Sequence, residues 1–292
     1  MDPAAPYYWN PLQLVALLFI LFQIILYVMS FHDKTKRIVL GASSLSSLTA
    51  LTVFLYNNLS GRPPGLCKGR ISMEKENFVL FGGRGSKRLF IQPVDEHDME
   101  LMNSEAAALQ KLVGHTDWCI AAVPVDDWNR DLTPWEAEPV FGKQGFGDGA
   151  AQTLDRLIRR VIPAIEREHP VPDRQYILCG YSLAGLFALW AAYQTDRFAG
   201  IVAASPSVWY RDWLTYAGGH DIRTPRVYLS LGDREEKARN PVMASVGHAI
   251  RAQYRMLAEA GIHSQLDWNP GNHFADSDRR MARGMAWICG AQ

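Results

Sequence analysis

One serine of the 292-residue chain has the surroundings expected of a nucleophile. An apolar run at residues 175–179 predicts a buried strand, and Gly-Tyr-Ser-Leu-Ala-Gly at 180–185 follows it and opens a helix predicted over 183–195. A tight strand-to-helix turn needs small residues such as Gly180 and Ala184 around an exposed serine. The helix N-terminus then directs N–H groups and its positive dipole end toward a developing oxyanion. The pattern predicts that Ser182 attacks a carbonyl carbon.

A serine nucleophile needs a general base, and the chain offers eight histidines. His273 follows a strand predicted at 264–268, within Gly-Asn-His-Phe at 271–274, whereas His263 precedes that strand. Reactive groups of a parallel sheet gather at the carboxyl ends of its strands. We therefore predict His273 as the base that takes the proton of Ser182 and returns it to the leaving alcohol.

An acidic partner for the histidine is expected after the preceding strand, because the chain order of this kind of triad is serine, acid, histidine. The strand predicted at 226–231 is followed by Gly-Asp-Arg-Glu-Glu-Lys at 232–237. Glu235 is favoured, since an acid three residues past the glycine has room to turn back toward the imidazole. Asp233 is the alternative, and Glu236 or no acid at all stays open.

Two backbone N–H groups are expected to stabilise the oxyanion. One is that of Leu183, directly after the serine. The other is expected in the loop after a strand predicted at 88–92, where Pro93 has no N–H and Val94 or Asp95 comes next.

Two loops rich in aromatic residues, 126–135 and 205–210, follow strands at the same edge of the predicted sheet. Their rings could line a substrate pocket or could equally pack on its rim. An arginine in the first loop could bind a substrate carboxylate or pair with a neighbouring aspartate. The candidate pocket residues are Trp128, Arg130, Trp135, Ser205, Trp209 and Tyr210.

The elements that must position these residues alternate along the chain, which predicts an α/β fold with a mostly parallel sheet and helices on both faces. The first two strands are separated by Gly-Gly-Arg-Gly at 82–85, which predicts a β-hairpin. Strands are predicted at 78–81, 88–92, 118–123, 175–179, 200–204, 226–231 and 264–268. Helices are predicted at 99–113, around 154–165, and at 183–195, 242–260 and 279–289.

The composition narrows the classes of function. Thirty Lys and Arg balance thirty Asp and Glu, which argues against a polybasic nucleic-acid-binding protein. A hydrophobic fraction of 48% supports a packed core. The four cysteines stand far apart without a CxxC pair, so neither a metal site nor a disulfide scaffold is indicated. We expect no metal and no organic cofactor.

The N-terminal part has a different character. Residues 11–30 carry no charge and are long enough to span a bilayer as a helix, and 38–60 form a second, weaker uncharged stretch. We predict two membrane helices at 1–60, a linker at 61–72 and an enzyme domain at 73–292. The protein would then lie at a membrane, on a side that the loop charges leave undecided. A cleavable signal peptide fits less well, and a cytoplasmic chain that starts near Met73 is the alternative.

Residues 73 to 289 resemble the esterase branch of the α/β-hydrolase fold, which groups esterase D, enterochelin-type siderophore esterases, feruloyl esterases and mycolyltransferases. The resemblance rests on the segments 180–185, 205–210, 232–235 and 271–273. It implies a serine hydrolase that acts on a small ester substrate through an acyl-enzyme. An acyltransferase with the same acyl-enzyme and an inactive membrane-anchored interaction module are the alternatives.

Overall fold

The structure, a computed structural model, describes residues 76–140 and 142–290, which belong to the unit Ser72–Gln292. Among these residues, no helix combines the length and the apolar character that crossing a membrane requires. The membrane helices predicted at 11–30 and 38–60 and the linker at 61–72 lie outside the described residues.

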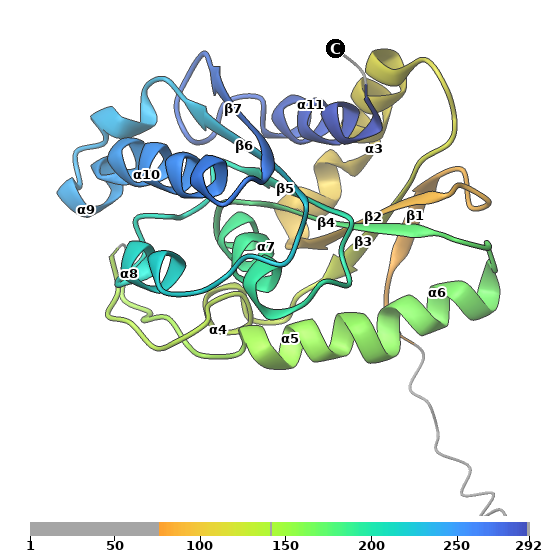
Figure 1. The fold of residues 1–292 in the computed structure, drawn as a ribbon, viewed down its shortest axis with the longest axis horizontal. Helices are drawn as coiled ribbons and strands as arrows, with labels where there is room; N and C mark the ends of the chain where they lie inside the picture. Colours follow the sequence, from red (N-terminus) through yellow and green to blue (C-terminus); the bar gives the residue numbers. More distant parts are fainter. Residues whose placement is uncertain (1–75, 141, 291–292) are drawn as a thin grey trace, which may run out of the picture. The chain divides into compact units, whose positions relative to one another are not determined.

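A mostly parallel sheet of seven strands forms the centre of the described part (Figure 1). The order is β1-β3-β2-β4-β5-β6-β7, and only β1 runs antiparallel to its neighbour. The prediction of a mostly parallel α/β sheet is confirmed, and a strand overlaps each of the seven predicted runs, with β1 and β3 each displaced by one residue. The strands are β1 (Val79–Gly82), β2 (Arg88–Val94), β3 (Cys119–Pro124), β4 (Gln175–Tyr181), β5 (Gly200–Ala204), β6 (Arg226–Gly232) and β7 (His263–Asn269).

The predicted β-hairpin between the first two strands is wrong. β1 pairs antiparallel with β3, while β2 lies between β3 and β4 and is parallel to both. Burial explains the arrangement: Leu89 and Ile120 on β2 and β3 are fully buried, whereas Val79 on β1 is 42% exposed. Strands that are apolar on both faces belong in the sheet interior, so the less buried β1 takes the edge.

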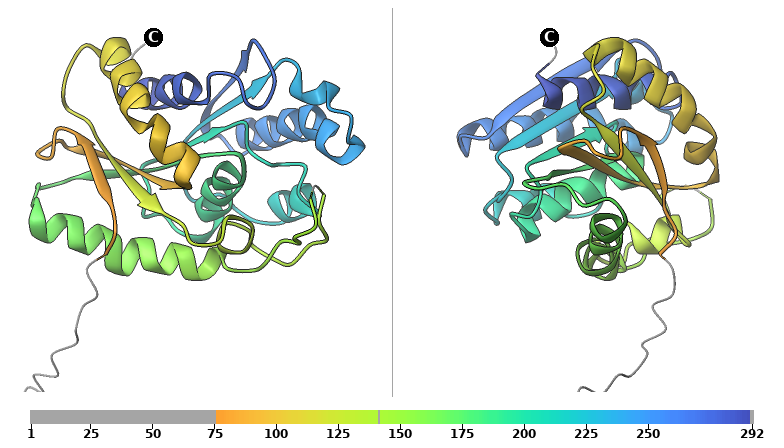
Figure 2. Two further views of the ribbon diagram at one scale, coloured as in Figure 1. Left: turned by 180° about the vertical axis from the view of Figure 1, so that it is seen from behind. Right: turned by 90° about the vertical axis from the view of Figure 1, so that its right-hand side faces the viewer.

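Helices cover both faces of the sheet, as predicted (Figures 1 and 2). Alternate residues of β2 point to opposite faces, so Leu89 and Ile91 join one core cluster and Phe90 the other. The cluster of Phe90 is closed by α3 (Glu96–Val113) and α11 (Ser277–Cys289), which lie side by side. The opposite cluster is closed by α5 (Ala150–Arg156), η1 (Leu157–Val161), α6 (Ile162–Glu168), α7 (Ser182–Gln194), α8 (Trp213–Gly218) and α10 (Val246–Glu259).

Several helices differ from their predicted extents. The helix predicted around 154–165 is longer and runs through α5, η1 and α6, and α11 begins two residues before the predicted 279. The helix predicted at 242–260 is divided at Ser245 into α9 (Pro241–Ala244) and α10. The helix predicted from residue 99 begins at Glu96, because the side chain of Asp95 accepts a hydrogen bond from the backbone N–H of Asp98 and so caps the first turn.

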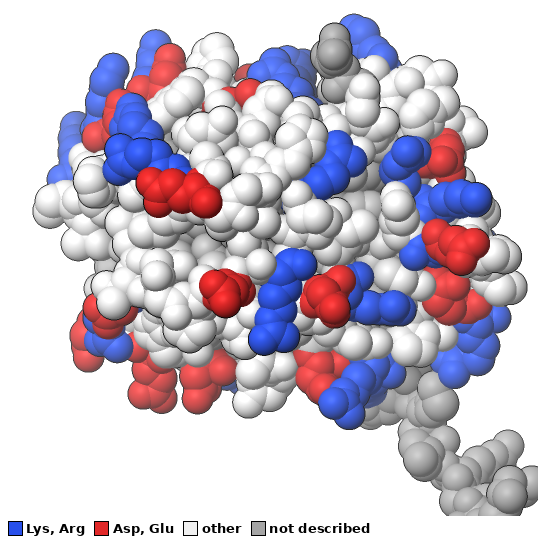
Figure 3. Space-filling model, in the orientation of Figure 1, with Lys and Arg blue, Asp and Glu red and all other residues white. Residues whose placement is uncertain are grey.

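Charges of both signs are interspersed on the surface. On the face drawn in Figure 3, Lys and Arg are interspersed with Asp and Glu. Ion pairs between exposed side chains include Arg159–Asp155 and Arg251–Glu236. This distribution agrees with the zero net charge of the chain.

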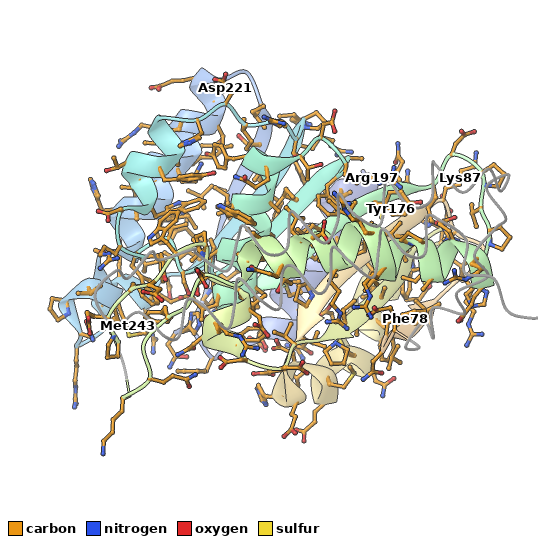
Figure 4. The ribbon with its side chains drawn as sticks, turned by 90° about the horizontal axis from the view of Figure 1, so that it is seen from below. Phe78, Lys87, Tyr176, Arg197, Asp221 and Met243 are labelled. Atoms are coloured by element: carbon orange, nitrogen blue, oxygen red, sulfur yellow. The ribbon has the colours of Figure 1, made fainter. Side chains whose placement is uncertain are left out.

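Two arginines fix the amino end of β4, opposite to its reactive end. The side chain of Arg174 is 1% exposed, pairs with Glu166 at 3.1 Å, and donates to the carbonyls of Arg84 and Ser86. The guanidinium of Arg197 lies 4.5 Å from the ring centroid of Tyr176, as Figure 4 shows from below. These contacts anchor the start of the strand that carries the serine turn at its other end.

Candidate active site

The turn from β4 into α7 has the geometry of a nucleophile elbow. Ser182 begins the helix with φ of +55°, in the left-handed region that residues with a side chain rarely adopt. A Cβ atom at Gly180 would lie 2.2 Å from the backbone of Ala184, so only glycine fits this position. The small residues of the motif thus allow the strand and the helix to approach closely, as the sequence predicted. The backbone strain of the turn lies at Ser182, the residue with positive φ.

The structure brings the three predicted triad residues together. Nε2 of His273 lies 3.0 Å from Oγ of Ser182, and Nδ1 lies 2.7 Å from Oε2 of Glu235. Because an ionised carboxylate only accepts hydrogen bonds, Nδ1 carries the proton and Nε2 accepts from the serine hydroxyl. The residues come from the ends of three different strands: β4, β6 through the short helix η2 (Glu235–Lys237), and β7.

The carboxylate of Glu235 is buried and held on its other oxygen as well. Oε1 accepts from the backbone N–H of Gly232 at 2.8 Å, from Ser205 Oγ at 2.7 Å and from Arg280 Nη1 at 3.1 Å. Burial raises the pKa of Glu235, but the hydrogen bond and charge of His273, with the bonds from Ser205 and Gly232, outweigh it and leave the pKa below its ordinary value. Glu235 is therefore ionised at neutral pH and can orient the imidazole.

The other acids of this loop face elsewhere. Oδ1 of Asp233 accepts from the backbone N–H of Gly271 at 2.9 Å, and its own N–H donates to the carbonyl of Asn269. Glu236 pairs with Arg251 at 2.8 Å on the surface. Of the three candidate acids, only Glu235 is placed against the imidazole, and Asp233 instead joins the two loops.

The predicted oxyanion donors lie at the same edge of the sheet as the serine. Leu183 is the second residue of α7, so its N–H belongs to the helix N-terminus. Val94 ends β2, which pairs with β4, and its carbonyl accepts from Val125. Asp95 is the N-cap of α3. The roles of Leu183 and of Val94 or Asp95 as donors stay predictions.

The aromatic loops pack on one another. Tyr210 is buried, and its hydroxyl donates to the carbonyl of Trp135. The ring centroids of the two residues lie 5.8 Å apart. Trp209 contacts Phe146 at 6.0 Å between centroids, and Trp128 packs against the core at the start of α4 (Trp128–Asp131). The contacts of Tyr210 and Trp135 favour rim packing over pocket lining.

The two polar pocket candidates also have other partners. Arg130 pairs with Asp131 at 2.6 Å, which is the second of the two roles considered for it. Ser205 is buried and belongs to the hydrogen bonds around Glu235, where it donates to the carboxylate. Neither side chain is placed as a wall of a substrate pocket.

Sequence reasoning missed several neighbours of the triad. Ser207 Oγ lies 3.4 Å from the oxygen of Ser182, and Phe274, directly after His273, is 86% exposed. The hydroxyl of Tyr181 donates to the carbonyl of His273 at 2.7 Å. The sequence did contain an indication of Arg280. It lies four residues before Gly284, on the buried face of α11. A charged side chain on a buried face requires a partner of opposite charge, so an arginine there indicates a buried anion.

Comparisons with known proteins bear on the family and on the fold. The family model described as "Putative esterase" matches residues 102–277, which include all three triad residues. An IroE-like serine hydrolase from Shewanella oneidensis is 18% identical with a TM-score of 0.61, covering 73% of this chain and 75% of that one. Siderophore hydrolase EstA from Aspergillus nidulans is 17% identical with a TM-score of 0.57, covering 79% and 99%. Enterobactin and salmochelin hydrolase IroE is 17% identical with a TM-score of 0.53, covering 74% and 90%. These structures share the fold.

Proposed function

Because the chain belongs to the Putative esterase family, we propose that it is a serine esterase that cleaves carboxylic esters through an acyl-enzyme on Ser182. The observation that supports this most directly is the continuous line of hydrogen bonds from Ser182 through His273 to Glu235. It lies at the carboxyl edge of the sheet, on a strained turn that presents the hydroxyl.

The reaction follows from the positions of these atoms. Oγ of Ser182 attacks the ester carbonyl while Nε2 of His273 takes the hydroxyl proton, and Glu235 stabilises the imidazolium that forms. The oxyanion of the tetrahedral intermediate accepts from the N–H of Leu183 and from that of Val94 or Asp95. Collapse breaks the C–O bond, and His273 returns the proton to the leaving alcohol. Water then attacks the acyl-enzyme by the same proton transfers and regenerates the serine.

Small carboxylic esters are the proposed substrate class. Two of the similar structures are named as hydrolases of siderophores, so ester-linked siderophores belong in the substrate panel beside simple esters. Release of an acyl group to an added alcohol in place of water would identify acyl transfer, which uses the same triad.

We expect the purified full chain to hydrolyse p-nitrophenyl acetate and butyrate. Ser182→Ala removes the attacking oxygen and is expected to lower kcat by about 10³-fold or more. Ser104→Ala, which changes a serine on α3, is the matched control and should keep wild-type activity. A fluorophosphonate probe should label the wild type and the control but not Ser182→Ala. A folded wild-type chain that is inert on every ester and unlabelled would contradict the proposed function.

The proposal extends to residues outside the described part. We propose that the uncharged stretches at 11–30 and 38–60 anchor the esterase to a membrane, because their length and composition suit bilayer-spanning helices.

A further inference from the structure

A buried arginine lies behind the catalytic carboxylate. Arg280, in the first turns of α11, is 1% exposed, and its Nη1 reaches three oxygens within 3.1 Å. These are Oε1 of Glu235 at 3.1 Å, Oγ of Ser205 at 3.1 Å and the hydroxyl of Tyr181 at 3.0 Å. One nitrogen therefore connects the acid to the ends of β4 and β5.

The second guanidinium nitrogen holds the loop that carries the base. Nη2 of Arg280 donates to the carbonyls of Pro270 at 3.1 Å and Asn272 at 3.0 Å, immediately before His273. The hydroxyl of Tyr181 donates to the carbonyl of His273 itself at 2.7 Å. The arginine thus bonds to the acid with one nitrogen and to the histidine loop with the other.

The charge of the arginine suits this place. A buried carboxylate is costly unless it is paired and fully hydrogen-bonded, and Glu235 forms an ion pair with Arg280 in which both side chains are 5% exposed or less. The planar guanidinium presents several donors in a fixed fork, so it can bond to a carboxylate and to two carbonyls at once. A lysine offers the charge but not the fork.

We propose that Arg280 is a positioning residue for the esterase reaction: it fixes Glu235 and the loop of His273 relative to each other, so that the imidazole reaches Ser182. Arg280 acts through these two residues, and its hydrogen bonds described above do not include the nucleophile Ser182. The inference rests on the proposed function of the triad.

A matched pair of arginines in the full chain tests the proposal. Arg280→Met and Arg174→Met each remove a buried guanidinium that bonds to a glutamate and to two loop carbonyls, but Arg174 lies at the amino end of β4, away from the triad. Both variants are expected to have a lower Tm. Below both Tm values, only Arg280→Met is expected to lower kcat, by about 10- to 100-fold with little change in KM, because the triad geometry is loosened.

The pH profile separates charge from geometry. The groups that bond to the Glu235–His273 pair are Arg280 from α11, Tyr181 from β4, Ser182 from α7 and Ser205 after β5. The nearest other acid, Asp233, bonds to the backbone of Gly271 in the adjoining loop. Loss of the positive charge in Arg280→Met favours protonation of the pair, so the acidic limb of the kcat/KM profile should move to higher pH. Arg280→Lys keeps the positive charge, so the acidic limb of its kcat/KM profile should stay at the pH of the wild type. Its kcat should still fall, because a lysine cannot bond to the carboxylate and to two carbonyls at once.

The outcomes are distinguishable. Wild-type kcat and an unchanged acidic limb in a folded Arg280→Met variant would show that the arginine only stabilises the fold, and the inference would be wrong. If Arg280→Met does not fold, Arg280→Lys decides, since wild-type kcat in that variant also overturns the inference. A wild-type chain that is inert and unlabelled by fluorophosphonate refutes the proposed function instead, before any arginine is changed.

Discussion

The two carboxylate oxygens of Glu235 have separate tasks. Oε2 faces Nδ1 of His273, while Oε1 is occupied by Gly232, Ser205 and Arg280. With one oxygen fully bonded, the carboxylate cannot rotate away from the imidazole without breaking three hydrogen bonds. The acid is therefore oriented by its surroundings before substrate arrives.

Replacing the two candidate acids by their amides is expected to separate their roles. Glu235→Gln should lower kcat by about 10²- to 10⁴-fold, because an amide neither stabilises the imidazolium nor selects the Nδ1–H tautomer. Asp233→Asn retains an oxygen that can accept from Gly271, so kcat should stay near that of the wild type. Ester hydrolysis under saturating substrate measures both values. A larger loss in Asp233→Asn than in Glu235→Gln would assign the acid to Asp233.

For the residues of the site, the sequence predicted that Ser182 and His273 meet, but not the whole network around them. Ser182 and His273 follow strands, so the rule that strand ends meet at one edge was enough to bring them together. Glu235 and Asp233 follow the same strand, and the short helix that begins at Glu235 decides which side chain turns back. Arg280 contacts four other segments, and the periodicity of its helix indicates that it is buried but not which partners it meets.

Among the elements, β2 and α3 enclose a second buried acid. Glu105 on α3 is 3% exposed, and its Oε2 accepts from Nε2 of Gln92 on β2 at 3.3 Å. Burial raises its pKa most, the bond from Gln92 offsets part of that rise, and the charges of Asp98 and Asp278 add to it, so that the pKa lies at about 8. The carboxyl is thus mainly protonated in the folded protein at neutral pH.

This acid makes the packing of α3 sensitive to pH. The unfolded chain releases the Glu105 proton near pH 4.5, whereas the folded chain keeps it to about pH 8. The stabilising contribution is therefore complete below the unfolded pKa and is lost as the pH rises through the folded one, by up to about 1.4 kcal/mol per pH unit. Glu105→Gln has no carboxyl to titrate at this position and so lacks this pH dependence. The difference between its free energy of unfolding and that of the wild type should therefore shift in favour of the variant as the pH rises.

Urea denaturation at several values of pH between the two pKa values measures the difference. Glu100→Gln, at an exposed position of the same helix, is the control and should parallel the wild type. If the Glu105→Gln and wild-type stabilities differ by the same amount at every pH, the buried carboxyl does not titrate as described.

The fold was predictable element by element, with one pairing error. Apolar runs identified all seven strands of the described part, and alternation with helices identified the parallel sheet. The hairpin was wrong because 82–85 has the composition of a tight turn, while the greater burial of β2 and β3 determines which strands pair. The sequence of the turn alone does not show which strand each of its neighbours will pair with, because the pairing depends on the burial of all the strands together.

For the whole molecule, the chain divides into the units Met1–Ile71 and Ser72–Gln292, and the proposed membrane anchor belongs to the first. If residues 11–30 and 38–60 span a bilayer, the full chain should remain in the membrane fraction after washes with high salt and with alkaline carbonate. Detergent should release it in active form, because the triad and its supports lie between residues 180 and 280. Release by salt or carbonate alone would contradict the anchor.

The helix that carries the serine has a consequence for how such an enzyme can diversify. Every residue of α7 from Leu183 to Tyr193 is buried, against the sheet on one side and neighbouring helices on the other. No position there can change size without disturbing the core. Changes in substrate preference are therefore expected to be tolerated best in the loops that follow the strands, which can change without repacking the helix that carries the serine.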